Sequence, residues 1–121
     1  MAAAQVRQRV GRDRIVGVSA HSVAQALEAV KNGADYLGVG AAFSTSTKRD
    51  ANVLPRGVLH DICEAVDVPV VAIGGISRAN IMRLSGTGVD GVALVSAIFA
   101  AEDIEAECRA LRALSEKMAG A

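Results

Sequence analysis

Short apolar runs alternate along the chain with stripes of helical period, and the alternation repeats four times. Each run is about six residues long, is rich in β-branched residues and ends in small or hydroxyl-bearing ones, which is typical of a buried strand. The runs cover residues 14–20, 35–40, 68–75 and 90–96. Pro69 stands at the entrance of the third run, where a missing N–H group costs a strand least. The pattern predicts four strands.

Helices are expected between these runs and after the last one. The first begins after the capping residue Ser22 and ends at Asn32-Gly33, and others cover about residues 57–66 and 102–118. Another begins at Ser77 and ends near residues 86–88, and residues 1–10 form the helix of a preceding unit. The side chains expected to face the core are Val23, Ala26, Leu27, Val30, Leu59, Ile62, Cys63, Ile81, Leu84, Ile104, Cys108, Leu111 and Leu114.

Strands that alternate with helices of this length predict an α/β fold with a parallel sheet and right-handed crossovers. The chain thus has four consecutive βα units in one domain, residues 1–121. A complete (βα)8 barrel takes about 250 residues, so a barrel interpretation has to account for a missing half. The connection 41–56 has no apolar period, and a loop of that length in a compact domain is usually functional.

The charge balance argues against large anionic partners. Thirteen basic residues offset thirteen acidic ones, and only three aromatic residues are present, so neither nucleic acid nor an anionic membrane is expected to bind. No apolar run approaches the ~18 residues of a membrane span, and the first residues carry charge where a signal peptide is apolar, which predicts a cytoplasmic protein. Cys63 and Cys108 are expected to be buried free thiols, because neither has a ligand partner at metal-binding spacing.

The residues that follow the four strands suggest a ligand site, because the carboxyl ends of parallel strands meet at one edge of a sheet. They supply hydroxyl groups, backbone N–H groups and one lysine, a set suited to phosphate. Glycines let a phosphate approach the backbone, and helix starts at Ser77 and near Ala97 present N–H groups to it. The strand-end residues are Ser19-Ala20-His21, Phe43 to Lys48, Gly74-Gly75 and Ser96.

Each of these residues also has a simpler interpretation. Gly74-Gly75 could form only a turn, Ser96 could cap a helix, and Lys48 could be solvated beside Arg49. His21 could be a helix-start residue without a catalytic role, and His60 lies within a helix and is expected to be structural or exposed. The agreement of four strand ends on one edge favours a phosphate site, in which Lys48 would add a charge-assisted contact.

Four motifs carry a family resemblance. GVSAHS, GADYLGVG followed by FSTSTKRDA, VPVVAIGGI and GVDGVALVSAIF resemble, in order and spacing, the last four βα units of thiamine-phosphate synthase. The resemblance implies the C-terminal half of a TIM (βα)8 barrel. It also implies a Mg2+-dependent transferase of thiamine biosynthesis that couples a pyrimidine methyl diphosphate to a thiazole phosphate and releases diphosphate.

Site residues follow from the same resemblance. Ser19 and Lys48 match the family's contacts to the diphosphate and are the candidate catalytic residues. The residues that match its contacts to the thiazole phosphate are Thr45, Ser46, Thr47, Gly75, Val95 and Ser96. The family commonly has proline where Ser44 and Ser46 stand, so this loop is expected to be less preorganised.

The resemblance places the pyrimidine cradle and both magnesium-binding aspartates before Met1, so the 121-residue chain alone is expected to be inactive. Four strands also leave two open edges and an uncovered inner face, which predicts a second copy or a complementary N-terminal half as partner. Two other functions stay open. One is a thiazole tautomerase, for which His21 would be the histidine, and the other is a non-catalytic half-barrel that binds a phosphorylated ligand.

Overall fold

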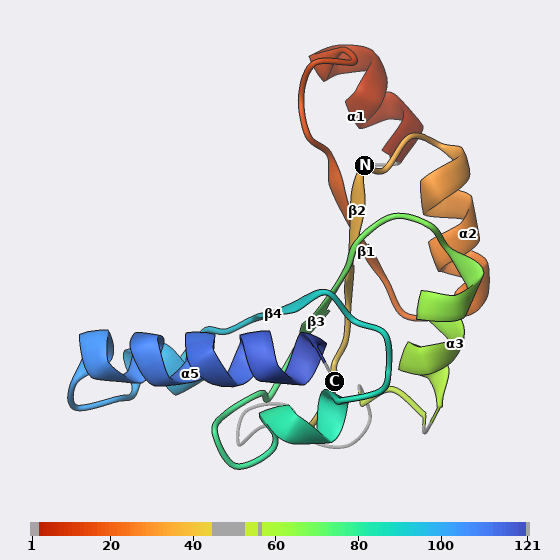
Figure 1. Ribbon diagram of the computed structural model, residues 1–121. Coiled ribbons are helices and arrows are strands. Elements are labelled where there is room, and N and C mark those ends of the chain that lie inside the picture. The colour runs from red at the N-terminus through yellow and green to blue at the C-terminus, as the bar shows by residue number, and fades with distance from the viewer. Residues whose placement is uncertain (1–2, 45–52, 56, 121) are drawn as a thin grey trace.

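The computed structural model describes residues 3–44, 53–55 and 57–120. Four strands, β1 (Gly17–Ala20), β2 (Tyr36–Val39), β3 (Val70–Ile73) and β4 (Gly91–Ala93), form one sheet in chain order. All three neighbouring pairs are parallel. The sheet is strongly twisted, so that β4 runs across the direction of β1 and β2 in the view of Figure 1. The prediction of four parallel strands is confirmed.

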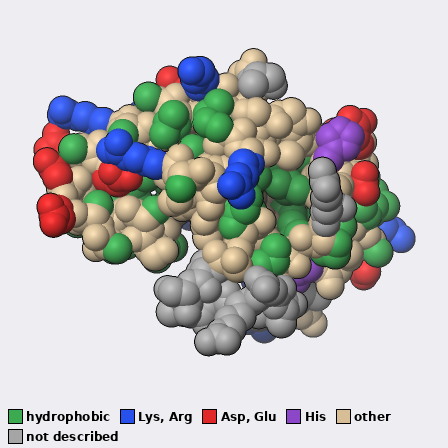
Figure 2. All heavy atoms as spheres, turned by 90° about the horizontal axis from the view of Figure 1, so that it is seen from below, with side chains coloured by type: hydrophobic (Ala, Val, Ile, Leu, Met, Phe, Trp, Pro, Cys, Tyr) green, Lys and Arg blue, Asp and Glu red, His purple; other side chains and the backbone are tan. Residues whose placement is uncertain are grey.

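Helices connect the strands where the sequence predicts crossovers. The connecting elements are α2 (Val23–Lys31), α3 (Val58–Ala65) and a 3₁₀ turn, η2 (Ile81–Leu84). The helix α1 (Ala3–Val10) precedes β1, and α4 (Ser96–Phe99) and α5 (Ile104–Ala119) follow β4. The hydroxyl of Ser22 accepts from Gln25 N at 3.1 Å and caps α2, as expected. Asp103 caps α5 in the same way, with Ala106 N as donor. Figure 2 shows acidic side chains gathered at the left, over the beginning of α5. Their negative charges interact favourably with the positive end of the helix dipole.

The α-helix predicted from Ser77 is wrong. The chain makes a turn there and then only the four-residue 3₁₀ helix η2. Side chains of the turn compete with helical hydrogen bonding, because the Ser77 hydroxyl accepts from Ala79 N and the Asn80 amide accepts from Ser77 N. Gly86 and Gly88, both with positive φ, then end the segment before an α-helix can develop.

Three predicted core positions are also wrong. Leu27 is 48% exposed, Ile104 is 45% exposed, and Cys108 lies at the surface as a free thiol. In α2 the fully covered positions are Ala26 and Ala29. In α5 they are Leu111 and Met118, and the main contacts of this helix are with η2, β4 and α4 at one end of the sheet.

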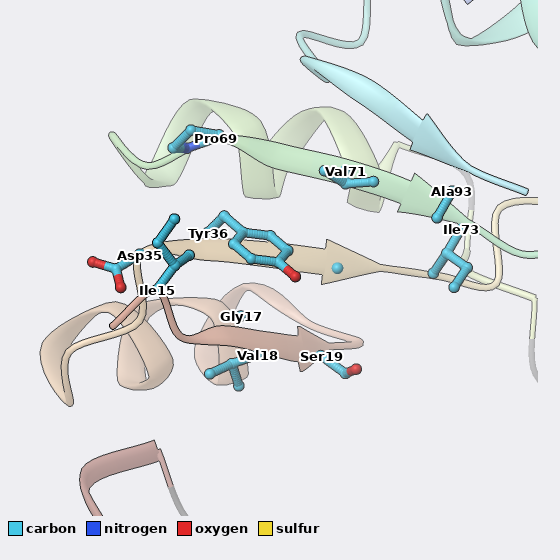
Figure 3. A pocket seen from close by; sticks show the side chains of 11 residues that line it. Ile15, Gly17, Val18, Ser19, Asp35, Tyr36, Pro69, Val71, Ile73 and Ala93 are labelled. Atoms are coloured by element: carbon cyan, nitrogen blue, oxygen red, sulfur yellow. The ribbon is translucent and has the colours of Figure 1, made fainter. Parts of the chain in front are cut away.

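Only one face of the sheet is covered in the described part of the chain. Leu37, Val39, Val70 and Ala72 are buried beneath the helices and belong to a continuous apolar core. The alternate positions point to the opposite face, which is hollowed by a pocket of about 840 Å³ (Figure 3). The pocket is lined by Ile15, Gly17, Val18, Ser19, Asp35, Tyr36, Gly38, Pro69, Val71, Ile73 and Ala93.

Among the described residues, none of the helices is both long and apolar enough to cross a membrane.

Candidate functional site

The described members of the predicted site follow the same ends of the parallel strands. Ser19 is the third residue of β1, and Figure 3 shows its side chain near the carboxyl end of that strand. Gly75 comes two residues after β3, Val95 lies between β4 and α4, and Ser96 is the first residue of α4. Thr45, Ser46, Thr47 and Lys48 lie outside the described residues. The described half of the predicted site therefore shares one edge of the sheet.

Hydrogen bonds join the loops after β2 and β3 beyond the end of the sheet. Ala42 N donates to the carbonyl oxygen of Ile73 at 2.9 Å, and Phe43 N donates to that of Gly74 at 3.1 Å. On the other side of the same loop, Leu54 N donates to the carbonyl oxygen of Ala41 at 2.8 Å. These bonds fix the backbone of residues 41–43 beside the Gly74-Gly75 turn.

Close packing explains why two glycines follow β3. Gly74 and Gly75 have φ of 102° and 66°, where other residues are strained. A Cβ atom on Gly75 would lie 2.5 Å from the carbonyl oxygen of Phe43 and 2.8 Å from that of Ser44. The glycines are thus required by the turn and by the approach of the β2 loop, whether or not a phosphate binds beside them.

The segment after β4 forms a single turn of helix. Val95 is the N-cap residue of α4, and its carbonyl oxygen accepts from Phe99 N at 3.0 Å. Ser96 is the first helical residue, so the alternative in which it caps the helix is wrong. Four residues give α4 only a small dipole, and Ser77 begins no α-helix. Of the two expected helix starts, the one near Ala97 is present and the one at Ser77 is not.

His21 links the ends of β1 and β2. Its Nδ1 atom lies 2.8 Å from the carbonyl oxygen of Gly40, and its backbone N–H donates to Oε1 of Gln25. Because a carbonyl oxygen only accepts, Nδ1 is the donor of this bond, and Nε2 takes no part in it. His60, on α3, is half exposed, as expected. Its Nε2 atom lies 3.5 Å from Oε1 of Glu64.

Asn80 belongs to the strand-end edge and was missed by sequence reasoning. Its Oδ1 atom accepts from Ser77 N at 2.8 Å, and its Nδ2 atom donates to the carbonyl oxygen of Gly75 at 2.8 Å. A signal was present, because an asparagine three residues after a serine often bonds to the backbone of its own turn. The expected helix from Ser77 concealed it.

Two kinds of reactive group are absent from the described part of this edge. No three His, Cys, Asp or Glu side chains among the described residues could hold a metal ion together. Cys63 is half-buried in α3, away from the strand ends, and burial, followed by the charges of Asp90 and Glu64, raises the pKa of its thiol to about 11. The described edge offers hydroxyl and backbone groups, which suits binding and orienting an anion.

Known proteins resemble this chain over nearly its whole length. The family model for thiamine monophosphate synthase matches residues 1–98. The thiamine-phosphate synthase of Clostridium beijerinckii is 52% identical over 110 residues, which cover 91% of this chain and 53% of that protein. The thiamine-phosphate synthase of Pyrococcus abyssi is 45% identical over 116 residues, which cover 96% of this chain and 56% of that protein.

A solved structure agrees with these sequence matches. The thiamine phosphate pyrophosphorylase from Pyrococcus furiosus superposes with a TM-score of 0.87 at 42% identity, covering 98% of this chain and 56% of that one. The chain therefore spans about half the length of the relatives that it matches. By its family model, its sequence identity and its fold, this chain belongs to the thiamine monophosphate synthase family.

Proposed function

We propose that this chain is the C-terminal half of a (βα)8 barrel and forms the thiazole-phosphate side of a thiamine-phosphate synthase active site. The complete site would couple a pyrimidine methyl diphosphate to a thiazole phosphate and release diphosphate, in the cytoplasm. Family membership supports this reaction. The observation that carries the assignment to this edge is the set of bonds between the loops after β2 and β3, which holds Phe43 and Ser44 beside Gly75, directly before the predicted phosphate-binding residues in the sequence.

The proposed chemistry makes electrostatic demands on the chain. The diphosphate leaves to give a pyrimidine methyl cation, and the thiazole nitrogen captures the cation. Negative charge grows on the leaving oxygens, where a lysine ammonium and a serine hydroxyl stabilise it, and we assign these roles to Lys48 and Ser19. Thr45, Ser46 and Thr47, with Gly75, Val95 and Ser96, would hold the thiazole phosphate and aim its nitrogen at the cation.

Magnesium does not fit the described residues of this chain. The described strand ends offer no carboxylate cluster, whereas Mg2+ is usually held by one or two carboxylates together with substrate phosphates. We place its ligands in the part of the relatives that lies outside these 121 residues. The chain alone is then expected to bind thiazole phosphate and to be inactive in coupling it to the pyrimidine.

The open face of the sheet supports the proposal of a partner. Tyr36 and Ile73 are 39% and 41% exposed there, and Ile15 is 80% exposed beside them. Burying large apolar side chains stabilises a fold by about 1.5–3 kcal/mol each, so this face favours association. We propose that a complementary N-terminal half, or a second copy of this chain, covers it.

A reconstitution assay tests the proposed function. The chain is mixed with the separately produced N-terminal half of the Clostridium beijerinckii enzyme, complex formation is verified, and thiamine phosphate is measured with both substrates and MgCl2. Product is expected only from the complex, and Lys48→Ala in the complex should lower kcat about 10²-fold, as loss of one charge-stabilising group does. A verified complex without product, or full turnover by the chain alone, would contradict the proposal.

The geometry of His21 favours thiazole tautomerase as the second candidate. With Nδ1 bonded to the carbonyl oxygen of Gly40, Nε2 is available as a general base. His21→Asn decides between the two functions in the complex. Loss of tautomerisation with coupling unaffected would favour the tautomerase, and unchanged rates of both would leave His21 a structural link. If neither reaction occurs while thiazole phosphate still binds, the non-catalytic binding module is the function.

A further inference from the structure

We propose that Asn80 is a positioning residue for phosphate binding, which it supports by holding the Gly74-Gly75 turn in place. This inference rests on the proposed function, because it assigns the phosphate to the same strand-end edge. Asn80 itself would not touch the ligand. Its side chain faces the backbone of its own turn, where both of its polar atoms have partners.

The amide of Asn80 bridges two points of the turn. Oδ1 accepts from Ser77 N, and Nδ2 donates to the carbonyl oxygen of Gly75, both at 2.8 Å. Only this orientation of the amide satisfies a donor and an acceptor at once, so the assignment of nitrogen and oxygen follows from chemistry. The bridge fixes the peptide of Gly75 at one end and that of Ser77 at the other.

The bridged turn also supports the loop after β2. A Cβ atom on Gly75 would collide with the carbonyl oxygens of Phe43 and Ser44, so these backbones already lie in contact. Phe43 N also donates to the carbonyl oxygen of Gly74. A shift of the Gly75 peptide would therefore displace the backbone that leads directly into Thr45.

The turn that Asn80 bridges also carries a backbone donor suited to an oxyanion. Within the part of the chain that the structure describes, the N–H group of Gly75 donates to no backbone acceptor. This N–H belongs to the Gly74–Gly75 peptide, whose carbonyl oxygen, on Gly74, accepts from Phe43 N. Asn80 holds the next peptide through the carbonyl oxygen of Gly75, so the peptides on both sides of Gly75 are fixed. A preorganised N–H donor binds an oxyanion more strongly than one that must reorient on binding.

The experiment titrates the chain with inorganic phosphate and follows amide signals in ¹H–¹⁵N spectra. Asn80→Ala removes both bonds, and Asn80→Ser, whose hydroxyl is too short to reach both partners, removes at least one of them without adding a charge. Either variant should weaken phosphate binding about tenfold, the effect of one or two lost hydrogen bonds, and should move the Ser77 signal. Asn32→Ala, at the C-cap of α2, is the matched control and should bind like the original chain.

The outcomes separate this inference from the proposed function. If the original chain binds phosphate and the Asn80 variants bind equally well although the Ser77 signal has moved, the positioning role is refuted and the proposed function stands. If the original chain shows no phosphate-dependent shifts near Gly75, the phosphate site itself is refuted. Should Asn80→Ala not fold, the uncharged Asn80→Ser gives the same comparison.

Discussion

The ring of Tyr36 lies over Gly17 on the open face of the sheet (Figure 3). The two residues are register partners in β1 and β2, and a Cβ atom on Gly17 would lie 2.2 Å from Cζ of the ring. A glycine in a strand is costly in itself, because it has no side chain to pack. Here it makes room for an aromatic side chain on the open face of the sheet.

Replacement of Gly17 by alanine should therefore displace the ring and lower the free energy of unfolding by about 1–3 kcal/mol, as overpacking does. Urea denaturation measures the change. Gly38→Ala is the matched control, because Gly38 lies on the same face and a Cβ atom there would meet no described atom within 4 Å. Equal effects of the two substitutions would show that the ring does not occupy this place. Tyr36→Ala should restore part of the loss in the double variant.

Gly75→Ala should weaken binding of thiazole phosphate as well as stability. Its φ of 66° and the carbonyl oxygens of Phe43 and Ser44 both oppose a side chain, and strained backbone of this kind costs about 1–3 kcal/mol. Gly11→Ala separates the two causes, since Gly11 also has a positive φ, of 83°, but no described atom within 4 Å. Calorimetric titration and urea denaturation of both variants test the prediction. A Gly75→Ala chain that binds normally would remove the turn from the site.

Arg7 and Asp35 should make stability depend on pH in the acid range. The backbone N–H of Val16, at 2.8 Å, and then Arg7 lower the pKa of Asp35 below its ordinary value of 3.8. A lowered pKa in the folded state means that the stabilisation is present above the unfolded value, near pH 4, and is lost as the pH falls below it. The urea midpoint should fall between about pH 5 and 3 more steeply for the original chain than for Asp35→Asn. Parallel curves would contradict this.

The two thiols should react at different rates. Cys108 is exposed, whereas the raised pKa of Cys63, about 11, leaves only about a thousandth of it as thiolate at pH 8. Iodoacetamide at pH 8 should alkylate Cys108 first and Cys63 only after denaturation, as mass spectrometry of peptides would show. The Cys108→Ser variant should stay unlabelled while folded, and rapid labelling of that variant would refute the assignment.

Most of the fold follows from local patterns. The four strands are short apolar runs between turns, and Ser22 and Asp103 cap helices because their side chains satisfy free N–H groups at any site of that kind. The wrong predictions concern burial, which depends on the elements that pack against a helix. Leu27 and Ile104 have the right helical period, but their burial depends on which elements pack against α2 and α5.

The residues of the candidate site also divide into those that the strand order predicts and those that depend on three-dimensional contacts. Ser19, Gly75 and Ser96 could be assigned to one edge because parallel strands all end on the same side. The bridge made by Asn80 could not be predicted from the sequence. It depends on the path of the Gly75 and Ser77 backbone and on the 3₁₀ turn that replaces the expected helix. Close packing of Gly75 against Phe43 likewise appears only in three dimensions.

Titration with thiazole phosphate tests most directly whether the strand ends hold a phosphorylated ligand. Calorimetry on the 121-residue chain without magnesium should show binding at one site, and replacing Lys48 and Ser96 together by alanine should weaken it at least about tenfold, because charge-assisted bonds are strong. An affinity untouched by that double replacement, or no binding by the original chain, would contradict the account.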